Sequence, residues 1–161
     1  MMQSARKTLA TRMAHWWFRR RLFKALALKK RGGVRPDGLS SRYLHNKLEI
    51  EWLARGVHPW QRDLSQNEVR QLFAEQCLDD TRTAIERLFF RLPEVDSIDF
   101  RVIDPGTYAA IVRGLIRREE VETDKAMASG MKLRNLGATF RLNDFAFEPL
   151  TSSVQSSSEE G

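Results

Sequence analysis

Three carboxylates occupy positions that would place them together on one face of a sheet. Glu49 and Glu51 alternate with apolar residues in KLEIEWL, and Asp99 has the same phase in VDSIDFRVI. An acidic cluster of this kind suits a metal-dependent nuclease, which also needs a nearby lysine. The same predicted face also carries four arginines: Arg101, Arg113, Arg117 and Arg141. Opposite charges on neighbouring strands commonly form ion pairs on the solvent-exposed face of a sheet, so we interpret the acids as ion-pair partners. We predict no metal and no other cofactor.

The three histidines and the single cysteine are the other candidates for catalysis. His15, His45 and His58 are not three or four residues apart, so they do not form a metal-binding pair on a helix. His58, in HPW, is a candidate general base, although a loop histidine more often binds the backbone. Cys77 falls within a helical apolar pattern, which favours a small buried residue over a nucleophile. With no glycine-rich phosphate loop and no nucleophile elbow, an enzyme of unknown reaction is only our third hypothesis.

Charge is distributed very unevenly along the chain. Residues 1–36 contain eleven Lys/Arg and no Asp/Glu, which gives a net charge of +11. The remaining 125 residues contain sixteen Lys/Arg and 21 Asp/Glu, which gives −5. All of the net positive charge therefore lies in the N-terminal arm, and such an asymmetry is typical of a segment that binds an anionic partner.

Aromatic residues accompany the cations of the arm in HWWFRRRLFKALALKKRGG, residues 15–33. Tryptophan favours the interface of a membrane, and each basic residue near an anionic bilayer contributes about 1 kcal/mol. The same residues would suit base stacking on a nucleic acid or docking on a protein. We predict that nine side chains make this contact: Trp16, Trp17, Arg19, Arg20, Arg21, Lys24, Lys29, Lys30 and Arg31.

These observations favour a non-enzymatic interaction module that the arm tethers to an anionic membrane surface or to a protein partner. A nucleic acid is the second hypothesis and ranks below the first, because the body is acidic and would repel phosphate. Its strand aromatics Trp52, Phe100 and Phe140 are also predicted to face inward, away from a stacking surface. No segment approaches the eighteen or so apolar residues of a membrane span. We expect a cytoplasmic location, at the periphery of a membrane if the arm binds lipid.

The arm itself has the composition of a helix. Residues 5–30 contain no proline or glycine, and RGG at 31–33 would stop the helix, so we predict a helical arm over 1–31. Leu9, Met13, Trp16 and Phe23 share a stripe of this helix, which Arg20 interrupts. Residues 32–44 are rich in glycine, proline and serine and predict a linker.

The body, residues 45–150, combines strand and helix patterns. Alternating apolar residues predict strands at 47–53, 95–103, 108–116 and 139–147. A capping box at Ser65 and Glu68 begins a helix that Pro93 ends, and Thr123 would cap a second helix over 124–136. The predicted fold class is α+β, and the order βαββαβ resembles the ferredoxin-like fold with its split βαβ unit. The polar tail, residues 151–161, is predicted to be disordered.

Overall fold

The computed structural model describes residues 2–26, 38–57, 63–121 and 127–151, with residues 2–13 described by their backbone alone. The fold is α+β, with a five-stranded mixed sheet. The helices are α1 (Met2–Leu26), α2 (Gln66–Arg91), α3 (Arg118–Val121) and α4 (Ser129–Asn135). The sheet contains β1 (Ser40–Leu44), β2 (Lys47–Leu53), β3 (Ser97–Ile103), β4 (Ala110–Arg117) and β5 (Ala138–Phe140). A separate hairpin is formed by β6 (Leu142–Asn143) and β7 (Ala146–Phe147).

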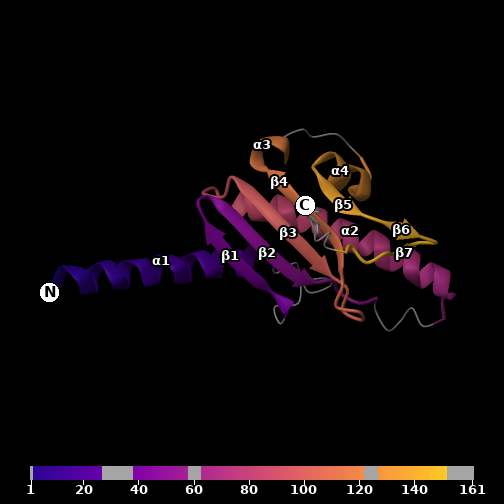
Figure 1. The fold of residues 1–161 in the computed structure, drawn as a ribbon, viewed down its shortest axis with the longest axis horizontal. Coiled ribbons are helices and arrows are strands. Elements are labelled where there is room, and N and C mark those ends of the chain that lie inside the picture. The colour runs from indigo at the N-terminus through magenta and orange to yellow at the C-terminus, as the bar shows by residue number, and fades with distance from the viewer. Residues whose placement is uncertain (1, 27–37, 58–62, 122–126, 152–161) are drawn as a thin grey trace, which may run out of the picture.

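The strands follow one another across the sheet in chain order, β1-β2-β3-β4-β5 (Figure 1). β2 and β3 are direct parallel neighbours joined through α2, and the other pairs are antiparallel. The ferredoxin-like order is therefore not confirmed, because a split βαβ unit would place another strand between the two that the first helix connects. The length and apolar alternation of a segment predict that it forms a strand. They do not predict which strands are neighbours in the sheet.

Helix α2 begins and ends close to the predicted positions. The Ser65 side chain accepts a hydrogen bond from the backbone N–H of Glu68, and the Glu68 carboxylate accepts one from the backbone N–H of Ser65. This reciprocal capping box satisfies two N–H groups that the first turn leaves without helical partners. At the other end, Leu92 is the C-cap immediately before Pro93. Near this end, Leu88 and Phe89 are buried in the core.

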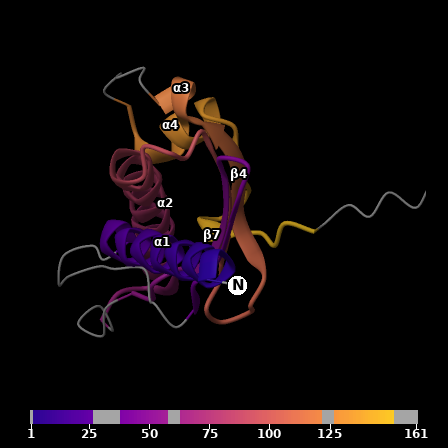
Figure 2. The same cartoon turned by 90° about the vertical axis from the view of Figure 1, so that its left-hand side faces the viewer.

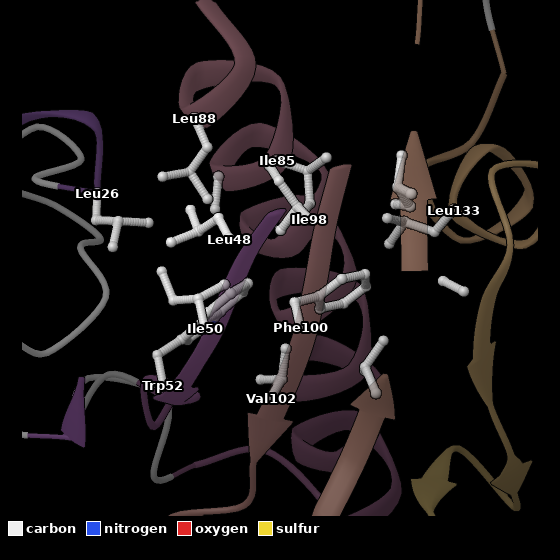
Figure 3. Close-up of a cluster of buried hydrophobic side chains, with 14 of the residues drawn as sticks. Leu26, Leu48, Ile50, Trp52, Ile85, Leu88, Ile98, Phe100, Val102 and Leu133 are labelled. Carbon is white, nitrogen blue, oxygen red and sulfur yellow. The ribbon is translucent and has the colours of Figure 1, made fainter. Parts of the chain in front are cut away.

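One face of the sheet carries the core, and the helices cover it. Buried side chains of β2 and β3 meet those of α2, while α4 adds Leu133 and the end of α1 adds Leu26 (Figure 3). Figure 2 shows the helices on one side of the sheet and the last described residues of the chain on the other. The uncovered side, which we call the open face, carries the charged residues of the alternating strands.

Strand β1 lies within the segment predicted to be a linker. All five of its residues are exposed, so it lacks the alternation of apolar side chains that reveals a half-buried strand. It pairs with β2 through a two-residue turn in which His45 and Asn46 have φ values of 49° and 60°. Positive φ at both central positions is the geometry that two-residue hairpins favour.

The C-terminal part of the body also differs from the prediction. Helix α4 begins at Ser129, not at residue 124, while the predicted cap at Thr123 lies outside the described residues. Gly137, with φ 98°, follows the end of this helix, where the left-handed conformation favours glycine. The predicted strand 139–147 is divided into β5 and a hairpin that turns at Asp144 and Phe145, both with positive φ.

Candidate interaction surface on the N-terminal helix

The last part of α1 is held against the body by one apolar face. The side chains of this face belong to the buried core cluster: Phe18, Leu22, Ala25 and Leu26. Their spacing of three to four residues places them on the same side of the helix, which packs against α2. Figure 1 shows that the rest of α1 extends away from the sheet and from α2. The body therefore anchors α1 at its C-terminal end and leaves the remainder of the helix projecting from it.

Contacts with β1 and with the loop after α2 fix the orientation of this anchor. The Phe18 ring stacks on Tyr43, with 4.6 Å between ring centroids, and the Arg21 guanidinium binds the Glu94 carboxylate. The Tyr43 hydroxyl in turn donates a hydrogen bond to the backbone oxygen of Glu94 over 3.1 Å. Burial raises the pKa of Tyr43, and the negative charges of Glu94 and Asp96 raise it further. Arg21 thus binds a carboxylate of the body.

The opposite side of α1 exposes aromatic and cationic side chains. Trp16 and Trp17 retain 55% and 51% exposure, and their rings meet edge to face at 5.1 Å between centroids. The guanidinium carbon of Arg20 lies 5.4 Å from the Trp16 ring and 5.8 Å from the Trp17 ring, within the range of cation–π interactions. We call the exposed side of this helix the Trp–Arg surface and define it by Trp16, Trp17, Arg19, Arg20, Phe23 and Lys24.

The Trp–Arg surface contains five of the nine residues predicted to contact a partner. Within the described part of the chain, Arg19, Arg20 and Lys24 form no ion pair, so their charges are directed to solvent. Arg21 points to the body. The remaining three residues, Lys29, Lys30 and Arg31, lie outside the described residues.

The buried side of α1 is not the stripe that stands out in the sequence. Trp16 and Phe23, two members of that stripe, are exposed, and Arg20 lies between them. The signal for the buried side is the four-residue spacing of Phe18, Leu22 and Leu26. Arginines lie on both flanks of these residues, so their spacing does not stand out in the sequence. Only the fold shows which side of α1 meets α2.

The carboxylates considered for a nuclease lie on the open face in ion pairs. Glu49 is 2.7 Å from Arg42, Asp99 is 3.0 Å from Lys47, and Glu51 is 3.1 Å from Arg101. Among the described residues, no group of three or more Asp, Glu, His or Cys side chains is arranged to hold a metal ion. The acids thus have the ion-pair role that their positions predict.

Cys77 and His58 add no catalytic group to the described structure. Cys77 is buried in the core, and burial raises the pKa of its thiol to about 12. A thiol of this kind is not the thiolate that nucleophilic chemistry requires. His58 lies outside the described residues.

Comparison with known proteins identifies no relative. The chain matches no family model, no curated protein and no solved structure. Across the described ranges, no helix combines the length and the apolar character needed to cross a bilayer.

Proposed function

We propose that this protein is a non-enzymatic interaction module that attaches to an anionic membrane surface through the Trp–Arg surface of α1. The observation that carries the proposal is the pair of exposed tryptophans, Trp16 and Trp17, on the side of α1 that faces away from its anchored side. Tryptophan is enriched at membrane interfaces, where its ring meets the acyl boundary and its N–H reaches water or headgroups.

Electrostatics supports the same orientation. Arg19, Arg20 and Lys24 lie on the exposed side of α1 with the tryptophans, in a segment of 36 residues that contains no acid. At about 1 kcal/mol for each basic residue near an anionic bilayer, these three would contribute about 3 kcal/mol. The rest of the chain would remain in solution, because the net charge of −5 on residues 37–161 is repelled by the lipid surface.

The anchored end of α1 gives the proposal a mechanical basis. The core contacts of Leu22 and Leu26 and the ion pair of Arg21 with Glu94 hold the Trp–Arg surface in a fixed orientation relative to the body. Membrane attachment would then orient the body as well, leaving the open face of the sheet accessible. A rigid anchor also reduces the entropy that the helix loses on binding.

Sedimentation of the full chain with vesicles tests this function. We expect binding to phosphatidylcholine vesicles that contain phosphatidylserine and much weaker binding to phosphatidylcholine alone. Replacing Arg19, Arg20 and Lys24 with serine removes about 3 kcal/mol, so the partition constant should fall about 100-fold at low salt. Replacing Trp16 and Trp17 with alanine should weaken binding at both low and high salt, because apolar insertion is not screened.

A matched control separates the Trp–Arg surface from aromatic exposure in general. Phe145, in the turn between β6 and β7, is 51% exposed, as Trp17 is. Phe145→Ala should leave vesicle binding unchanged. If the full chain does not bind anionic vesicles near physiological salt, the proposal is wrong. Binding to DNA or RNA that vanishes with salt but survives the tryptophan changes would instead favour the nucleic-acid hypothesis, and binding to an acidic protein would favour a protein partner.

A further inference from the structure

The open face of the sheet contains a polar hollow of about 680 Å³. All five strands of the sheet contribute charged or hydroxyl side chains to its lining, from β1 at one edge to β5 at the other. Among the lining residues are Arg42, Glu49, Asp99, Arg101, Arg113 and Thr139. None of the described helices covers this side in Figure 2, so the described part of the chain leaves the hollow open to a ligand from solution.

Ion pairs engage all three carboxylates of the hollow, one of them with Lys47 outside its lining, and leave Arg113 without a carboxylate partner among the described residues. Arg42, Lys47 and Arg101 each bind an acid of β2 or β3. Arg113, half-buried in the middle of β4, has no ion pair or hydrogen-bond partner among the described residues. It lies opposite Arg101 on β3 and opposite Thr139 on β5. The β4 side of the hollow is therefore positive, with a guanidinium whose donors are available to a carboxylate.

The last described residues of the chain lie beside β4, and an acidic sequence follows them. The backbone N–H of Leu150 donates to the oxygen of Ala110, at the start of β4, over 2.8 Å. Arg113 is three residues further along this strand, or about 10 Å at roughly 3.3 Å per residue. From Leu150 to Glu159 the chain can extend about 30 Å, which is ample to reach Arg113. Residues 152–160 contain two glutamates and no basic residue.

We propose that the hollow is a carboxylate-binding site that receives Glu159 and Glu160 of the same chain. A carboxylate placed between Arg113 and Thr139 would accept charge-assisted hydrogen bonds from the guanidinium and a further one from the hydroxyl. Linkage through nine residues gives an effective concentration in the millimolar range, so a contact with a Kd of about 1 mM would be about half occupied.

A spin label next to the two glutamates tests this docking in the full chain. A nitroxide is attached at Ser156→Cys, and the buried Cys77 thiol is inaccessible to the reagent. We expect the amide signals of Arg113 and Thr139 to lose intensity in the paramagnetic state and to recover when the label is reduced. Arg113→Gln, or Glu159→Gln with Glu160→Gln, should reduce this loss to the level that the tethered but undocked segment gives, and so should high salt.

Arg117 provides the matched control, because it lies on the same side of β4 but outside the lining of the hollow. Arg117→Gln should leave the signal loss unchanged. The proposal is overturned if the amides keep their intensity at low salt, or if the loss is equally large when both glutamates are replaced. It is also overturned if a chain that ends at Thr151 binds a separate acidic peptide through Arg113 while the full chain shows no signal loss, since the site would then serve another molecule.

Discussion

α1 and α2 are helices of nearly equal length, 25 and 26 residues, but the body holds them differently. α2 has a capping box at its start and buried residues from Ala74 to Phe89. α1 has no acidic residue in its first turn, and its buried side chains begin at Phe18 among those described. Tertiary packing normally supplies most of a helix's stability, so the contrast indicates that α2 builds the fold and α1 presents a surface.

The contrast between α1 and α2 is tested most strongly by removing a large side chain from α2, which should have the largest effect on stability. Phe89 is buried, and the Arg118 guanidinium lies 5.0 Å from its ring. Phe89→Ala should lower the free energy of unfolding by about 3–5 kcal/mol, because it leaves a cavity under the sheet. Denaturant unfolding measures this loss. A change below about 1 kcal/mol would mean that α2 does not carry the core.

Two neighbouring residues of α1 test whether its anchored side contributes to the fold. Leu22 is 1% exposed and Phe23 is 38% exposed. Leu22→Ala should cost about 2–5 kcal/mol, whereas Phe23→Ala should change stability by less than about 0.5 kcal/mol. Equal effects at the two positions would contradict the assignment of the buried side.

The cap of α2 should have a smaller effect that depends on pH. Hydrogen bonds from the Ser65 side chain and backbone hold the pKa of Glu68 below its ordinary value. A lowered pKa means that the contribution is present above the unfolded pKa and is lost as the pH falls through the folded one. Ser65→Ala should cost about 1 kcal/mol near neutral pH and less in acid. A cost that does not decrease in acid would show that the capping box is not formed.

The ion pair that orients α1 should contribute less to stability than the cap of α2. Arg21 and Glu94 are both partly exposed, and exposed pairs contribute about 0–1 kcal/mol. A double-mutant cycle with Arg21→Gln and Glu94→Gln should give a coupling energy within that range. A coupling energy well above it would mean that this contact carries the attachment of α1, which we assign to Leu22 and its apolar neighbours.

The exposed side of α1 should contribute least to stability. Replacing Trp16 and Trp17 with alanine should change the free energy of unfolding by no more than about 0.5 kcal/mol, since neither ring is in the core. Thermal and denaturant unfolding check this. A large loss of stability would show that the Trp–Arg surface is structural and would break the contrast between the two helices.

The parts of the molecule that the sequence predicts are those in which one local pattern has one structural meaning. The strict alternation of KLEIEWL predicts β2, and Ser65 with Glu68 predicts the start of α2. Strand β1 carries no such pattern because all of its residues are exposed. The parallel pairing of β2 with β3 depends on contacts distant in sequence, so alternation does not predict it.

The candidate site was predictable only in part for the same reason. The composition of residues 15–33 predicts an aromatic and basic segment, and Trp16, Trp17 and Arg20 do lie together on α1. Nothing in that composition distinguishes Arg21, which binds Glu94, from Arg20, which stacks on the tryptophans. The distinction arises from the position of α2 and β1, which determines the side of α1 that is covered.

Quenching of tryptophan fluorescence by brominated lipids tests the proposed membrane contact most directly. Wild-type chain is compared with a Trp16→Phe, Trp17→Phe variant, which retains aromatic rings on α1 and retains Trp52, buried in the core. On anionic vesicles that contain brominated lipid, the emission of bound wild-type chain should be quenched, and the quenching per bound molecule should be largely lost in the variant. Equal quenching per bound molecule in the two chains, or no quenching of bound wild-type chain, would contradict insertion of Trp16 and Trp17 into the interface.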